Sequence, residues 1–135
     1  MTWSGSLLDG SGTIDHVGSG AFGPLDVTWA SRTEESNGQT SPEELIAAAH
    51  ASCFSMALSG ALAKAGTPPE RLETSATVTF VPGTGITKTA LTVRGSVPGM
   101  DEEAFRAAAE SAKDNCPVSK ALEAVPEISL DASLS

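Results

Sequence analysis

Two cysteines, Cys53 and Cys116, are the strongest candidates for chemistry in this sequence of 135 residues. A cysteine thiolate attacks electrophilic oxygen, sulfur or carbon atoms and also binds metal ions. The pair is no CxxC motif, and the sequence alone does not show whether the two sulfur atoms meet. Cys53 lies among alanine, methionine and histidine, which is also typical of an inert core cysteine. Cys116 precedes Pro117, so we expect it at a helix break, where the next helix N-terminus favours a thiolate.

A cation would be needed to activate Cys53, and its own segment supplies none within ten residues. Arg32 is a candidate, although it could equally form a surface ion pair with Glu34 or Glu35. Glu43 is a spare carboxylate at the start of the same segment, where it could instead only compensate the helix dipole.

His50 lies one helical turn before Cys53, which allows a His–Cys nucleophile pair or half of a zinc site. The chain contains only two histidines and two cysteines, so a metal site is disfavoured. A core or interface histidine is the preferred interpretation. No phosphate-binding or dinucleotide-binding motif is present, and we expect neither a metal nor another cofactor.

The charge balance excludes several function classes. The net charge is −9 with only eight lysines and arginines, which argues against nucleic acids and against anionic membrane surfaces as partners. The first ten residues lack the basic start and apolar run of a signal peptide. We therefore expect a cytoplasmic protein, in which the two cysteines are free thiols, metal ligands or a redox pair.

The residues from Thr40 to Gly66 predict one long helix that carries Cys53 in its middle. Ser41 is a suitable N-cap, Pro42 suits the first helical position, and Glu44 completes a capping-box pattern. Gly66 and the prolines that follow it are typical of a helix end.

No charged residue occurs between Leu45 and Ala63, so this helix is apolar on nearly every side. The many alanines and serines argue against a membrane span, and a chain of this size would struggle to bury such a helix alone. Glu43 and Cys53 are ten residues apart, about 15 Å along a straight helix. A site shared by both residues therefore requires a bend or a second chain.

The other segments predict an α+β fold with antiparallel pairing in a single domain, residues 1–135. We expect a hairpin turn at Asp9-Gly10 between strands Trp3–Leu8 and Gly12–Val17, and a further strand from about Leu25 to Ser31. The alternation from Leu72 to Val97 predicts a second hairpin. A helix capped by Asp101, a short helix after Pro117 and a strand over residues 126–133 complete the chain.

Two motifs resemble those of the OsmC/Ohr family. They are TSPEELIAAAHASCFSMAL, residues 40–58, and NCPVSKAL, residues 115–122. The resemblance extends to Trp3-Ser4-Gly5 and Ala30-Ser31-Arg32, and the details around Cys53 are more similar to the OsmC branch. One departure is Thr33, where relatives often carry an aromatic residue.

The resemblance implies an OsmC-like fold, with antiparallel sheets around long central helices in an intertwined homodimer. It implies a thiol-dependent peroxidase that reduces organic hydroperoxides in oxidative or osmotic stress defence. Cys53 would be the peroxidatic cysteine and Cys116 the resolving one, with Arg32 and Glu43 in the active site. The partners would be the hydroperoxide and an external dithiol reductant, for example of lipoyl type. The alternatives are a non-catalytic dimer that binds a small apolar ligand and a metal-binding module.

Overall fold

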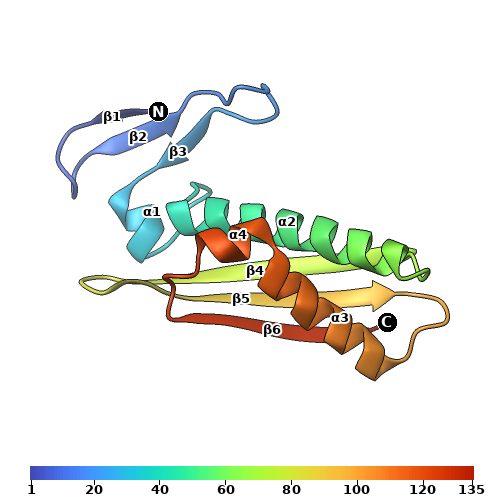
Figure 1. Ribbon diagram of the computed structural model, residues 1–135. Coiled ribbons are helices and arrows are strands. Elements are labelled where there is room, and N and C mark those ends of the chain that lie inside the picture. Colours follow the sequence, from blue (N-terminus) through green and yellow to red (C-terminus); the bar gives the residue numbers. More distant parts are fainter. The chain divides into compact units, whose positions relative to one another are not determined.

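The computed structural model describes residues 1–135, which form two compact units, residues 1–45 and residues 46–135. Figure 1 shows the elements of each unit in chain order. The boundary falls inside the long helix α2, Pro42–Lys64. A single domain over residues 1–135 stays a prediction.

The first unit contains a three-stranded antiparallel sheet made of β1 (Thr2–Ser4), β2 (Ser11–Ile14) and β3 (Leu25–Val27). A hairpin was expected here, but its strands are shorter than predicted, because residues 5–10 form a wider loop closed by a hydrogen bond from Gly10 N to Ser6 O.

The predicted strand from Leu25 to Ser31 is wrong in its second half. A short helix, α1 (Trp29–Thr33), begins there instead. Thr28 caps this helix: its hydroxyl accepts a hydrogen bond from Ser31 N, and the Ser31 hydroxyl accepts one from Thr28 N. This reciprocal pair satisfies two backbone donors at the helix start, and it outweighs the strand propensity of Val27 and Trp29.

The second unit contains a sheet in the order β4-β5-β6, formed by β4 (Arg71–Val81), β5 (Gly85–Ser96) and β6 (Glu127–Leu134). β4 and β5 form the predicted antiparallel hairpin. β6 instead pairs with β5 in parallel, whereas antiparallel pairing was expected. The physical reason is the crossover through α3 (Glu102–Asn115) and α4 (Pro117–Ala121), which carries the chain back before β6 starts.

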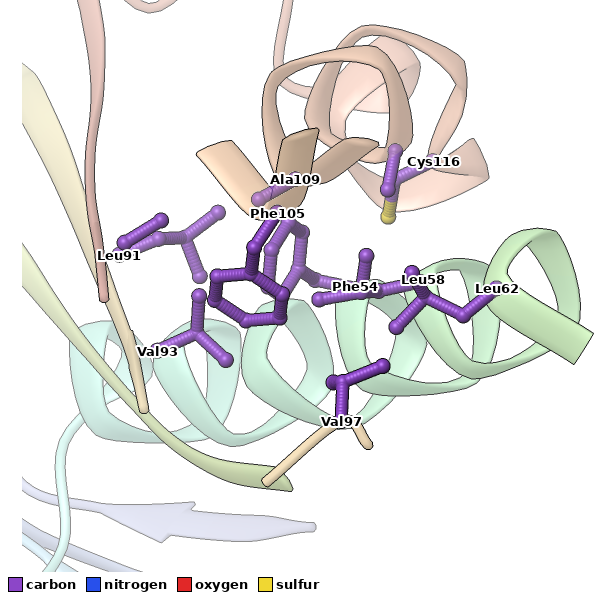
Figure 2. Packing of buried hydrophobic residues seen from close by; sticks show 11 residues of the cluster. Phe54, Leu58, Leu62, Leu91, Val93, Val97, Phe105, Ala109 and Cys116 are labelled. Carbon is purple, nitrogen blue, oxygen red and sulfur yellow. The ribbon is translucent and has the colours of Figure 1, made fainter. Parts of the chain in front are cut away.

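The core of the second unit lies between α2, α3 and one face of β5 (Figure 2). Leu91 and Val93 alternate with outward-facing residues on β5, as a strand with one covered face requires. Gly95 continues this face, and a Cβ atom there would lie 2.6 Å from the Phe105 ring. The missing side chain therefore lets Phe105 pack directly against the strand. The buried apolar residues that complete this core are Phe54, Leu58, Leu62, Val97, Ala109, Ala112, Cys116 and Ala132.

The Ser41 cap and the Gly66 end of α2 are as predicted, but the predicted capping box is only half formed. The Ser41 hydroxyl accepts a hydrogen bond from Glu44 N, while the Glu44 carboxylate accepts one from the Thr40 hydroxyl. Gly66 adopts a positive φ of 89°, which ends the helix without steric cost.

By length and composition alone, α2 could cross a membrane. The core helix of a soluble protein can have the same length and composition. Only 28% of its most apolar window is buried within this chain. Met56, for example, is 73% exposed. Much of the apolar surface of α2 is therefore left uncovered by the chain itself.

Candidate functional site

Cys53 on α2 and Cys116 between α3 and α4 are free thiols that lie close enough to shift each other's pKa. Figure 2 shows the Cys116 sulfur directed from the end of α3 towards α2. Cys116 is fully buried, whereas Cys53 is half-buried. The fold thus brings together two cysteines that are distant in the sequence, and it leaves only one of them accessible.

The pKa of the Cys53 thiol is raised above its ordinary value. A hydrogen bond from the Val118 backbone N–H lowers this pKa, but burial and the hydrogen bond and charge of Cys116 together raise it more. None of these influences is a positive charge. The second unit by itself therefore does not activate Cys53.

The pKa of the Cys116 thiol is lowered. Burial raises this pKa, but several hydrogen-bond donors outweigh burial: the Ser119 and Val118 backbone N–H groups, the Cys53 thiol and the Ser119 hydroxyl. As predicted, Cys116 lies at the break before α4, and the N–H groups of the residues after Pro117 favour its thiolate form.

Arg32 and Glu43 form a tight ion pair within the first unit. Arg32 Nη2 donates a hydrogen bond to Glu43 Oε1 at 2.8 Å, and Arg32 Nε lies 3.1 and 3.2 Å from the two carboxylate oxygens. Glu43 is only 7% exposed, so its carboxylate holds the guanidinium in a fixed direction. The sequence left open a surface ion pair of Arg32 with Glu34 or Glu35, and the structure places the Glu43 carboxylate on the guanidinium.

An apolar pocket of about 180 Å³ lies beside Arg32 in the first unit. The Arg32 guanidinium sits 5.9 Å from the centre of the Trp29 ring, within range of a cation–π interaction. The hydroxyl of Thr33 is used elsewhere, since it donates to the Trp29 backbone oxygen. Trp29 therefore supplies an aromatic ring beside the arginine although Thr33 does not. The pocket lining consists of Met1, Trp3, Leu7, Val27, Thr28, Trp29, Arg32 and Pro42.

His50 is a core histidine, as the preferred interpretation of the sequence held. Its side chain is fully buried, with Nδ1 2.9 Å from Thr89 Oγ1 and Nε2 2.8 Å from Ser119 Oγ. Burial lowers the pKa of His50 below its ordinary value. Sequence reasoning missed Thr89 and Ser119, because a lone hydroxyl on a strand or helix gives no signal of its partner.

No group of three or more His, Cys, Asp or Glu side chains in the chain is placed to hold a metal ion. The arrangement offers instead two neighbouring thiols and, in the other unit, a cation fixed by a carboxylate beside an apolar pocket. Such groups are suited to thiol chemistry on a substrate with an apolar part.

This chain belongs to the OsmC family, since the model of OsmC-like proteins matches residues 35–131. Among curated proteins it is 43% identical over 135 residues to a protein named peroxiredoxin OsmC from Escherichia coli (strain K12). The alignment covers 98% of this chain and 92% of that relative. A Shigella flexneri protein of the same name shows the same identity and coverage.

The fold is that of solved organic hydroperoxide resistance proteins. The structure of one from Elizabethkingia anophelis superposes with a TM-score of 0.72 at 23% identity, covering 99% of this chain and 94% of that one. The Bacillus subtilis protein OhrB gives a TM-score of 0.67 at 22% identity, with coverages of 99% and 95%. These likenesses place the α+β architecture in the OsmC/Ohr group.

Proposed function

We propose that this chain is a thiol-dependent peroxidase that reduces organic hydroperoxides to alcohols in oxidative or osmotic stress defence. The observation that carries the proposal is the pair of neighbouring free thiols, Cys53 and Cys116, which shift each other's pKa. Its support from relatives is the name peroxiredoxin on proteins 43% identical over nearly the whole chain. The proximity of two thiols suits a cysteine that is oxidised and a second cysteine that resolves it.

Cys53 is the peroxidatic cysteine in this proposal. Its half-buried sulfur can meet a peroxide, whereas the Cys116 sulfur is fully buried. The Cys53 thiolate attacks the terminal oxygen of ROOH, and the O–O bond breaks. The leaving alkoxide takes up a proton to become the alcohol, and Cys53 becomes a sulfenic acid.

Arg32 supplies the positive charge that the thiol pair lacks. Its guanidinium would stabilise the Cys53 thiolate and polarise the peroxide, and its donors would face the negative charge that develops on the leaving oxygen. Glu43 holds the guanidinium through the bidentate ion pair. Because Arg32 is pre-oriented, little reorganisation is needed when the peroxide binds.

Cys116 then attacks the sulfenic sulfur, which forms the Cys53–Cys116 disulfide and releases water. An external dithiol, for example of lipoyl type, restores both thiols by disulfide exchange. The lowered pKa of Cys116 favours this step, because a thiolate is the attacking form.

The active protein is a homodimer in which Arg32 and Glu43 of one chain serve Cys53 of the other. Two observations support this arrangement. The apolar helix α2 is largely uncovered in the single chain. Glu43 and Cys53 also lie ten residues apart on α2, about 15 Å along a straight helix, too far for a shared site within it.

The pocket beside Arg32 would receive the organic part of the substrate. Its lining includes Trp3, Leu7 and Trp29, which favour an alkyl or aryl group over water or hydrogen peroxide. A hydroperoxide bound there would place its polar end towards the guanidinium.

Steady-state consumption of cumene hydroperoxide by the reduced protein tests the proposal. A dithiol such as dihydrolipoamide should sustain turnover, and Cys53→Ser should abolish it. If Cys53→Ser still reduces the hydroperoxide, the assignment is wrong. Binding of an apolar ligand without any loss of peroxide would favour the non-catalytic alternative.

A further inference from the structure

Arg32 lies on a helix that is too short to hold its own position. This helix, α1, has five residues, Trp29–Thr33, and none of them is buried. A helix of this length is unstable by itself in water, because it forms too few hydrogen bonds to offset the ordering of its backbone. The Glu43 carboxylate holds the guanidinium at the far end of the Arg32 side chain. The backbone of α1 therefore needs an anchor of its own.

The Ser31 hydroxyl provides such an anchor directly beside Arg32. The hydroxyl oxygen lies 2.9 Å from Thr28 O, within the turn of α1, and 3.1 Å from Thr40 O, beyond the loop that separates α1 from α2. It also accepts a hydrogen bond from Thr28 N at 3.0 Å. The single hydroxyl proton of Ser31 is therefore shared between α1 and the segment that leads into α2.

A second side-chain hydrogen bond joins the same two segments. The Thr28 hydroxyl, which caps α1, donates to Gln39 Oε1 at 2.9 Å. The backbone around Gln39 is itself held: Gln39 N donates to Ser36 O at 2.8 Å, and Thr40 N donates to Asp26 O, on β3, at 3.0 Å. α1 is therefore fastened to a segment that the sheet of the first unit already holds in place.

The hydrogen bond from Ser31 to Thr40 lies close to the ion pair along both segments. Ser31 directly precedes Arg32, and Thr40 lies three residues before Glu43. An arginine side chain has many rotamers, so it could reach the same carboxylate from several backbone positions. A fixed backbone and the ion pair together restrict the guanidinium to one orientation.

We propose that Ser31 is a positioning residue for Arg32, and that its hydroxyl holds α1 against the segment entering α2 so that the guanidinium stays oriented for the peroxide step. This inference rests on the proposed peroxidase function for its catalytic meaning. The chemistry of the step is unchanged: the Cys53 thiolate takes the terminal oxygen, the O–O bond breaks, and a sulfenic acid and an alcohol form. Ser31 acts on this step through Arg32.

Rapid mixing of the reduced protein with cumene hydroperoxide measures the kinetic effect. Ser31→Ala should slow sulfenic acid formation about three- to tenfold, the range expected for one uncharged hydrogen bond. Disulfide formation should keep its rate, because attack by Cys116 does not involve Arg32. Ser31→Thr retains a hydroxyl and should restore most of the rate of the first step.

Thr33→Ala is the matched control for Ser31→Ala. The Thr33 hydroxyl also belongs to α1, but it donates to Trp29 O at 2.9 Å within the helix and does not bond to the segment entering α2. Its loss should leave the rate of sulfenic acid formation unchanged. Equal slowing by Thr33→Ala and Ser31→Ala would show a general weakening of α1 and would overturn the proposal.

A double-mutant cycle distinguishes positioning of Arg32 from any other role of Ser31. In Arg32→Ala, the further change Ser31→Ala should slow sulfenic acid formation less than about twofold, because the guanidinium that Ser31 positions is already absent. A further slowing of about three- to tenfold, or no slowing by Ser31→Ala alone, would overturn the proposal. If Ser31→Ala fails to fold, Gln39→Ala removes the other bond between the two segments and is judged by the same outcomes.

NMR of the Arg32 Nε–H group needs no peroxide and so separates this inference from the proposed function. In the unmodified reduced protein this group should be rigid and slow to exchange with water, because it lies 3.1 and 3.2 Å from the two Glu43 oxygens. In Ser31→Ala it should exchange about three- to tenfold faster, whereas Thr33→Ala should leave it unchanged. Unchanged exchange in Ser31→Ala contradicts the inference even if the protein reduces peroxide. Faster exchange upholds the positioning role even if no peroxide is reduced.

Discussion

Cys53 and Cys116 lie close enough to shift each other's pKa, yet only Cys53 is even partly accessible. A substrate that reaches this pair therefore contacts Cys53 first. The pKa of the buried Cys116 thiol is lowered, whereas that of Cys53 is raised. The two cysteines of the proposed reaction thus differ in solvent access and in the direction of their pKa shift. This difference allows each step to be tested separately.

Removing the buried thiol should stop the reaction halfway. Cys116→Ser should consume one equivalent of organic hydroperoxide per chain and then hold Cys53 as a sulfenic acid, because no second sulfur can displace the hydroxide. A diketone reagent that labels sulfenic acids, followed by mass spectrometry, measures the trapped species. Full turnover by Cys116→Ser with a dithiol would show that the external reductant resolves Cys53 without Cys116.

The guanidinium of Arg32 should matter at the first step only. Arg32→Ala should slow sulfenic acid formation about ten- to a hundredfold, because it removes hydrogen bonds to a charged group and leaves Glu43 unpaired. It should also raise the pKa of Cys53 in the assembled protein. Stopped-flow kinetics over a range of pH measures both effects. Arg94→Ala, at an exposed position on β5, is the matched control, and equal effects of the two substitutions would remove Arg32 from the site.

A mixed dimer of two impaired variants, Arg32→Ala and Cys53→Ser, tests whether the active site contains residues from both chains. Arg32→Ala and Cys53→Ser homodimers should each be impaired, but a mixed dimer regains one site, composed of Arg32 from one chain and Cys53 from the other. Co-expression with two different affinity tags isolates the mixed dimer for a hydroperoxide assay. If each site lies within a single chain, the mixed dimer stays as impaired as its parents.

Burial of His50 should make stability depend on pH. The pKa of His50 is lowered in the folded chain, so below the ordinary value of 6.5 the unfolded chain binds a proton that the folded chain does not. The free energy of unfolding should therefore be highest above pH 6.5 and fall as the pH decreases below that value. It should level off below the pKa that His50 has in the folded chain. Urea unfolding at several pH values measures this trend. His50→Gln should weaken the dependence, whereas His16→Gln, at an exposed histidine, should not.

The long helix and the β4–β5 hairpin were predictable because local signals mark them. Ser41, Pro42 and Gly66 mark the ends of α2, and the alternation from Thr74 to Phe80 sets the face of β4. The parallel pairing of β6 was not predictable in this way. It depends on where two helices return the chain, which is a tertiary property that the residues of β6 do not encode.

The candidate site also combines features that the sequence predicts with features that depend on tertiary structure. The motifs around Cys53 and Cys116 pointed to both thiols, and Arg32 and Glu43 followed from resemblance. The proximity of the two cysteines, the bidentate ion pair and the Trp29 ring beside Arg32 all depend on folding. Thr33 illustrates the limit, because the aromatic group absent at this position is supplied four residues earlier in α1.

Mass spectrometry of the reduced chain after one equivalent of cumene hydroperoxide tests the central claim most directly. The account predicts that the intact chain loses the mass of two hydrogens and that a peptide map contains a disulfide between Cys53 and Cys116. An unchanged mass, with the hydroperoxide still present in solution, would contradict it.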